Sequence, residues 1–140
     1  MDQPQGPLVH SHRYIDALGW AAELHRRQQR KVKSVPYISH LLAVSALVWE
    51  DGGDEEQAIA ALLHDAIEDA GVCAAQITAR FGERVAQLVL DCTESGPNQP
   101  SGGVKEPWLL RKTRYLAHLE HANLDALLIC AADKAHNARD

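Results

Sequence analysis

Ala61-Leu62-Leu63-His64-Asp65-Ala66-Ile67-Glu68-Asp69 is the stretch of this sequence that decides the fold. Apolar side chains recur through it at spacings of three and four residues, from Ile59 to Ile67, which is the period of an α-helix with one buried face. Advancing by about 100° per residue places His64, Asp65, Glu68 and Asp69 together on the other side. The pattern predicts one amphipathic helix that presents a histidine and three carboxylates.

The acidic face of this helix has two interpretations. A solvated surface is the more common one for an amphipathic helix. However, Asp65 lies three residues before Glu68 and four before Asp69, and each like-charged pair costs roughly a few tenths of a kcal/mol when no cation is near. A bound metal ion would make use of that repulsion.

Composition limits the class of protein. The chain has 140 residues, 46% of them apolar, 24% charged and 5% aromatic, which is typical of a single compact helical domain. Its net charge of -5 argues against nonspecific nucleic-acid binding. Its three cysteines, Cys73, Cys92 and Cys130, are widely spaced and odd in number, so they indicate neither a disulfide framework nor a cysteine zinc site. We find no signal segment or membrane span, and we expect a cytoplasmic protein.

Capping residues and glycines divide the chain into helices. Residues 1–10 are expected to be a flexible tail, followed by a domain over residues 11–140. Ser11, Asp54 and Asn123 are N-cap residues, and Gly82 is a helix stop. The expected helices cover about 12–29, 38–50, 55–69, 74–81, 83–93 and 107–121, with a last one from 124 onward. Residues 30–36 form a basic connector, and 95–103 form a loop.

Two further positions join His64 and Asp65 as candidate metal ligands. Asp133 follows an apolar run, where a buried carboxylate needs a cationic or metal partner. His40 follows Pro36 and opens an apolar helix; alone, it would more often be a packed core histidine. Together these four residues offer two imidazoles and two carboxylates. That mixture suits a six-coordinate ion such as Mn²⁺ or Fe²⁺, and Zn²⁺ is an alternative.

The order of these residues resembles that of the HD-domain phosphohydrolases, whose ligands are a histidine, a His-Asp pair and a distant aspartate. More narrowly, the chain resembles the hydrolase domain of RelA/SpoT-type proteins and the small stand-alone alarmone hydrolases. The segments that carry this resemblance are Arg30-Lys31, Pro36-Tyr37-Ile38-Ser39-His40, Leu62 to Asp69, Phe81-Gly82 and Ala132-Asp133-Lys134-Ala135-His136-Asn137. They occur in order from about residue 20 to the end of the chain.

The resemblance implies an all-α bundle of about six to seven helices around a single Mn²⁺ ion. It implies removal of the 3′-pyrophosphate from guanosine penta- or tetraphosphate, a reaction of the stringent response. Carried over by position, Glu68 and Asp69 would orient or deprotonate the attacking water. Arg30, Lys31 and Asn137 would bind the nucleotide. The family continues with further helices after the last motif, so the sequence is compatible with a domain truncated at its C-terminal end.

Two alternatives to this function remain open at the level of sequence. One keeps the metal chemistry and changes the substrate to another nucleotide or a phosphorylated cofactor. The other is a non-catalytic nucleotide-sensing module that keeps the bundle without turnover. The retention of all four ligands and of Glu68-Asp69 favours an enzyme. The sequence does not indicate an oligomeric state.

Overall fold

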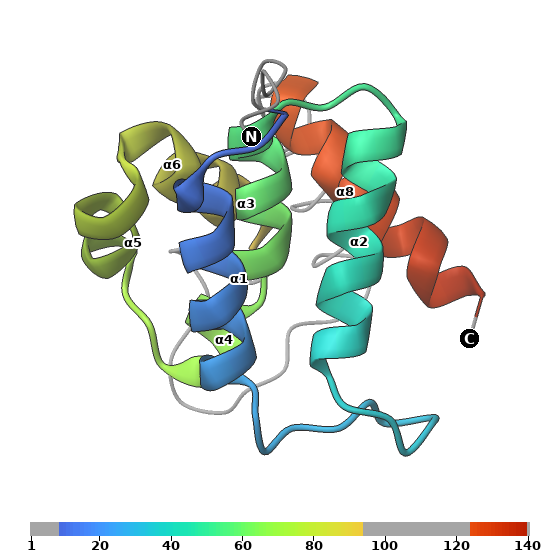
Figure 1. Cartoon of the computed structure of the whole chain (residues 1–140). Coiled ribbons are helices and arrows are strands. Elements are labelled where there is room, and N and C mark those ends of the chain that lie inside the picture. The colour runs from blue at the N-terminus through green and yellow to red at the C-terminus, as the bar shows by residue number, and fades with distance from the viewer. Residues whose placement is uncertain (1–8, 94–123, 140) are drawn as a thin grey trace, which may run out of the picture.

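The computed structural model describes residues 9–93 and 124–139, and in these residues the protein is all-α (Figure 1). The only β pairing in that part of the chain is an isolated bridge between Gln29 and Pro36. The described helices are α1 (His12–Leu24), α2 (Ile38–Glu50), α3 (Glu55–Leu63), α4 (Ala66–Ala70), α5 (Ala74–Phe81), α6 (Glu83–Cys92) and α8 (Leu124–Ala138). The all-helical fold expected from the sequence is confirmed.

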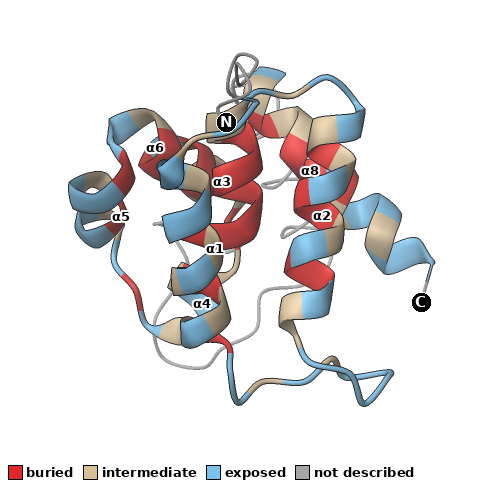
Figure 2. Ribbon diagram, in the orientation of Figure 1, coloured by how far each residue is buried: buried red, intermediate tan, exposed pale blue. Residues whose placement is uncertain are grey.

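Helix α3 is the centre of the core. Every residue from Gln57 to Leu63 is buried, and α1, α2, α6 and α8 all pack against the helix. Figure 2 shows this helix as an almost continuous buried segment, whereas α1 and α5 carry exposed residues along their outer faces. Because other helices pack around α3, the residues that follow its last turn lie at one end of the core.

Local sequence signals explain where α3 begins. Asp54 accepts a hydrogen bond from the Gln57 backbone N–H, and the Gln57 side chain accepts one from the Asp54 N–H, which completes a capping box. The preceding Gly53 lies against Val48, where an added Cβ would come within 2.5 Å of a side-chain methyl group. Only glycine fits this close corner between α2 and α3.

A polar cluster around Arg84 holds three helices together. The Arg84 guanidinium on α6 contacts Glu56 at 2.9 Å, Asp54 at 3.0 Å and Asp125 at 2.9 Å. The hydrogen bond from Arg84 keeps the pKa of Glu56 below its usual value. The amide of Gln57 also donates to the backbone carbonyl of Asp125. The start of α8 is therefore tied directly to α3 and α6.

Two boundaries predicted from the sequence are wrong. The first helix ends at Leu24, and not near residue 29, because the chain turns at His25 and then pairs with itself through Gln29 and Pro36. The helix predicted through Asp69 is interrupted: α3 ends at Leu63, and Asp65 has φ −103° and ψ 3° before α4 begins. The other expected helices begin and end at or within one residue of the predicted positions wherever they are described.

Some predictions lie outside the described residues. They are the tail over residues 1–8, the loop at 95–103, the helix at 107–121 and the cap at Asn123.

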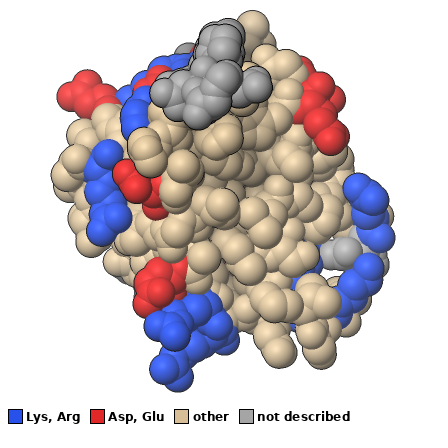
Figure 3. Space-filling model, viewed as in Figure 1, with Lys and Arg blue, Asp and Glu red and all other residues tan. Residues whose placement is uncertain are grey.

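Among the described residues, no helix has both the length and the apolar character that a membrane span requires. The face shown in Figure 3 carries its basic groups in separate patches around the rim, with acidic groups between them.

Candidate metal centre

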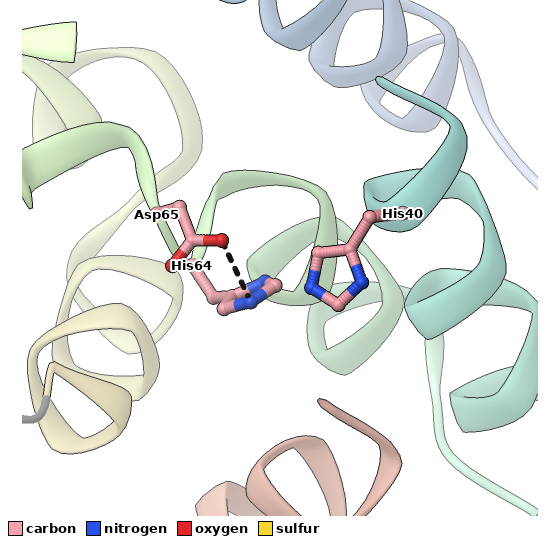
Figure 4. Close-up of side chains that lie close together, drawn as sticks. All are labelled: His40, His64 and Asp65. Carbon is pink, nitrogen blue, oxygen red and sulfur yellow. Dashed lines mark ion pairs between the residues drawn. The ribbon is translucent and has the colours of Figure 1, made fainter. Parts of the chain in front are cut away.

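The structure brings the four predicted metal ligands together from three parts of the fold. His40 lies in the first turn of α2, His64 and Asp65 occupy the break between α3 and α4, and Asp133 is on α8. Figure 4 shows the imidazoles of His40 and His64 facing each other, with the Asp65 carboxylate turned toward His64. The two ring centroids are 5.5 Å apart. Both histidines are almost fully buried.

The spacing of the donor atoms fits a divalent ion. Asp133 Oδ1 lies 2.9 Å from His40 Nε2 and 3.1 Å from His64 Nε2, and Asp65 Oδ2 lies 3.1 Å from His64 Nε2. Ligands at about 2.1 Å from an ion in octahedral geometry are separated by about 3.0 Å. One ligand atom from each of His40, His64 and Asp65 also falls within 4.8 Å of the others. The donor set is thus compatible with a metal ion held between α2, α8 and the α3–α4 break.

The backbone fixes which nitrogen of His64 faces the centre. His64 Nδ1 lies 2.6 Å from the carbonyl oxygen of Ala61, one turn back in α3. A carbonyl only accepts hydrogen bonds, so Nδ1 carries a proton and Nε2 is directed at the carboxylates. This arrangement orients the ring for metal binding through Nε2.

The electrostatics of the cluster follow from these contacts. Burial alone would lower the pKa of His64, but its hydrogen bonds to Asp133 and Asp65 raise that pKa well above the usual value. Burial would raise the pKa of Asp133, and its hydrogen bonds with His40 and His64 nevertheless lower it far below the usual value. The pKa of Asp65 is lowered in the same way by His64. The site therefore favours charged carboxylates, which are good ligands for a divalent cation.

Tyr37 is a site residue to which the sequence assigned no role. Its hydroxyl donates a 2.5 Å hydrogen bond to Asp65 Oδ2. Burial, followed by the charge of Asp65, raises the pKa of Tyr37, so the phenol stays protonated and remains a donor. The adjacency of Tyr37 to the Pro36 and His40 motif was the only sequence signal for it. The Tyr37 hydroxyl and His64 Nε2 thus contact the same oxygen of Asp65, Oδ2.

Of the two residues predicted to act on the attacking water, Glu68 lines the pocket beside the candidate ligands and Asp69 does not. Glu68 lines a pocket together with His64, Asp65 and Asp133. The other residues that line this pocket are Cys92, Ile129, Cys130 and Lys134. Asp69 is exposed in the next position of α4, does not line this pocket, and accepts a hydrogen bond from Gln28 at 3.1 Å.

Two of the three predicted nucleotide-binding residues, Arg30 and Asn137, contact each other. Arg30 donates to the side-chain oxygen of Asn137 at 3.2 Å, and the amide of Asn137 lies 3.3 Å from Asp133 Oδ1. These contacts join the connector between α1 and α2 to the face of α8 that carries the candidate ligand Asp133. Lys31 is exposed in the same connector, next to Arg30. Arg30 thus reaches a residue that contacts the candidate ligand Asp133.

Comparison with known proteins agrees with this geometry. A family model described as the HD domain matches residues 17–140. The chain belongs to the HD-domain family. Within that family it is related to the MESH1- and SpoT-type ppGpp 3′-pyrophosphohydrolases, as the sequence resemblance implied.

Three individual proteins illustrate the relation of this HD domain to others. The guanosine-3′,5′-bis(diphosphate) 3′-pyrophosphohydrolase MESH1 of Xenopus tropicalis is 34% identical over 129 residues, which cover 90% of this chain and 68% of the relative. A probable enzyme of the same name from Synechocystis is 34% identical over 88% of this chain, which spans only 16% of that protein. A solved structure described as a metazoan orthologue of SpoT that hydrolyses ppGpp has a TM-score of 0.80 and 30% identity, covering 96% of this chain and 72% of that one.

Proposed function

We propose that this HD domain is a metal-dependent phosphohydrolase that removes the 3′-pyrophosphate of guanosine penta- or tetraphosphate. The observation that carries the proposal is the convergence of His40, His64, Asp65 and Asp133 at donor spacings of about 3 Å beside Glu68. The names of the relatives support the choice of substrate, because MESH1 of Xenopus tropicalis acts on guanosine-3′,5′-bis(diphosphate).

His40, His64, Asp65 and Asp133 would hold the ion. Imidazole and carboxylate donors suit Mn²⁺ best in this combination, and Fe²⁺ or Zn²⁺ can use the same donors. When bound, a divalent ion lowers the pKa of a coordinated water and polarises a phosphoryl oxygen. The hydrogen bond between His64 Nδ1 and the Ala61 carbonyl directs His64 Nε2 toward the ion position. The hydrogen bond from the Tyr37 hydroxyl helps to hold the Asp65 carboxylate in place.

Glu68 and Asp69 would act on the attacking water. Glu68 lines the pocket that His64, Asp65 and Asp133 share, so its carboxylate can accept a proton from water there. Asp69 follows it in α4 and, as the resemblance implies, would help to orient the attacking water. Attack by water on the phosphorus next to the ribose 3′ oxygen breaks that P–O bond, leaving a 3′-hydroxyl and free pyrophosphate.

Arg30, Lys31 and Asn137 would bind the nucleotide. The substrate is strongly anionic and the chain has a net charge of -5, so cations near the site are needed to offset repulsion. Arg30 already reaches Asn137 on α8, which places its guanidinium on the metal-ligand side of that helix. A planar guanidinium is well suited to hold phosphate oxygens.

A nucleotide assay with defined metals tests the function. Purified protein is stripped of metal, supplied with Mn²⁺, Mg²⁺ or Zn²⁺, and incubated with guanosine tetraphosphate and a panel of other phosphorylated nucleotides. We expect guanosine diphosphate and pyrophosphate in equal amounts with Mn²⁺. Turnover of a different nucleotide would reassign the substrate, and nucleotide binding without turnover at any of these metals would favour a sensing module.

Two variants separate metal binding from chemistry. Asp65→Asn is expected to lower both metal content and activity. Glu68→Gln is expected to keep the metal and lower kcat by about 10²–10⁴-fold, the range for loss of a general base. Glu83→Gln is the matched control, because Glu83 is an exposed glutamate at the start of α6. Equal activity of the Glu68 and Glu83 variants would contradict the role of Glu68.

A further inference from the structure

His25 is a buried histidine with no role in the metal centre. It follows the last residue of α1 and is only 2% exposed. Its Nδ1 lies 2.8 Å from Gln28 Oε1. Its Nε2 is the one buried side-chain nitrogen or oxygen in residues 9–93 and 124–139 that has no hydrogen-bond partner. Burying an unpaired polar atom costs free energy, so this arrangement needs a physical reason.

The reason lies in the orientation of the Gln28 amide. Gln28 Nε2 is 3.1 Å from Asp69 Oδ2. An ionised carboxylate only accepts hydrogen bonds, so the NH₂ group of Gln28 must face Asp69 and the carbonyl must face His25. His25 must then donate from Nδ1, which leaves the lone pair on Nε2. The opposite tautomer would turn the amide over and direct its carbonyl oxygen at the Asp69 carboxylate.

The backbone around Gln28 fixes the position of this amide. The Gln28 carbonyl accepts a 2.8 Å hydrogen bond from the Tyr37 N–H, across the connector between α1 and α2. The ring of Tyr37 packs against that of His25, with centroids 5.4 Å apart. In Figure 1 the end of α1 lies beside α4, which carries Asp69. The connector thus contacts one site carboxylate through Tyr37 and another through Gln28.

We propose that His25 and Gln28 form a positioning pair that holds the Asp69 carboxylate in one orientation for the hydrolytic step. This inference rests on the proposed function, in which Asp69 orients water. Asp69 is exposed and α4 has only five residues, so the side chain needs an external support to keep one rotamer. Gln28 supplies a donor at Asp69, and the buried imidazole prevents the Gln28 amide from rotating. The unpaired Nε2 of His25 is the consequence of keeping that donor in place.

Kinetics of matched variants test the pair. Gln28→Met keeps the length of the side chain and removes both hydrogen bonds. We expect kcat to fall about 10–100-fold, the range for loss of a residue that orients a site group, with KM and metal content unchanged. Gln29→Met is the control, because Gln29 is the exposed neighbouring glutamine. A kcat within twofold of the wild type for Gln28→Met would overturn the proposal.

The two residues should also act as one unit. His25→Leu is expected to lower kcat as much as Gln28→Met does, and the double variant should be no slower than either single variant. His25→Asn retains an N–H donor near the position of Nδ1 and should restore most of kcat. Fully additive losses, or His25→Asn as slow as His25→Leu, would contradict the pairing.

A spectroscopic measurement examines the pair without turnover. Long-range ¹H–¹⁵N spectra of the full chain at a pH where histidines are neutral should show His25 with its proton on Nδ1, and a change of that signal in Gln28→Met. A proton on Nε2 would overturn the proposal. An inactive wild type on the nucleotide panel would instead overturn the proposed function, whereas an active wild type with unaffected Gln28 and His25 variants would overturn only this inference.

Discussion

Metal binding at this centre should release one proton, and this prediction follows from His64. In the metal-free protein both nitrogens of His64 face acceptors: Nδ1 faces the Ala61 carbonyl, and Nε2 faces Asp65 and Asp133. The ring therefore carries both protons, in agreement with a pKa raised well above its usual value. A metal ion needs the Nε2 lone pair and must displace that proton.

The size of the effect follows from the proton count. The pKa values of Asp65 and Asp133 are lowered, so both are already ionised near neutral pH and release nothing. If one proton is released on binding, each rise of one pH unit lowers the Kd for Mn²⁺ about tenfold, or by about 1.4 kcal/mol in binding free energy. This holds at pH values below the raised pKa of His64.

The raised pKa of His64 also determines how the stability of the metal-free fold changes with pH. Because the pKa of His64 is raised in the metal-free fold, the stabilisation from its charged ring is complete below its unfolded pKa of about 6.5 and is lost as pH rises through the folded value. Mn²⁺ replaces that proton, so the increase in melting temperature on adding Mn²⁺ should grow with pH.

Calorimetric titration of the metal-free protein with Mn²⁺ at pH 6.0 and 7.0 measures the effect. Two buffers of different ionisation enthalpy give the number of protons released, expected to be close to one. The control is His12→Gln, which changes an exposed histidine at the start of α1 and should leave the proton count unchanged. A proton count near zero, with the same Kd at both pH values, would refute the reasoning.

Three further outcomes are expected. Tyr37→Phe removes the hydrogen bond to Asp65 and should weaken Mn²⁺ binding about 10–100-fold in calorimetry, so an unchanged Kd would contradict the role of the hydroxyl. Leu62→Ala should lower the free energy of unfolding by about 2–5 kcal/mol in urea, whereas Leu124→Ala, at a residue 79% exposed, should change it by less than about 0.5 kcal/mol. Asp54→Ala removes the cap of α3 and should cost about 1 kcal/mol in the same assay; no loss would show that the cap is dispensable.

The sequence predicts most helix boundaries because local signals decide them. The capping box at Asp54 and the glycine at position 82, with φ +97°, act within a few residues of the helix ends that they set. The end of α1 has no such signal: residues 26–29 are all good helix formers. The chain turns there because His25 is buried and the Gln28 carbonyl pairs with the Tyr37 N–H, and both contacts are tertiary.

The break between α3 and α4 could not be read from the sequence either. The apolar stripe runs in phase from Ile59 to Ile67, so periodicity alone predicts an unbroken helix. The helical phasing expected for the polar residues therefore does not hold beyond Leu63. The interruption frees Asp65 from regular helix geometry, and its carboxylate reaches both His64 and Tyr37.

The candidate metal ligands could be predicted from the order of the motifs, whereas the residues that hydrogen-bond to the site carboxylates could not. His40, His64, Asp65 and Asp133 were predicted, and the structure brings them to one point. Tyr37 contacts the candidate ligand Asp65, whereas Gln28, which pairs with His25, contacts Asp69. These contacts join residues that are far apart in the sequence or have no motif of their own. Such contacts become visible only when the connector is folded against α4.

The length of helix α3 sets the position of His64 relative to the cap at Asp54. The helix is capped at Asp54 and ends at Leu63, and the candidate ligand His64 follows at once. One residue added or removed between cap and ligand would rotate His64 by about 100° and move it about 1.5 Å along the axis. The buried side chains on every face of α3 leave no room to absorb such a change. Proteins that share this centre should therefore keep the ten-residue step from Asp54 to His64 even where the residues within it differ.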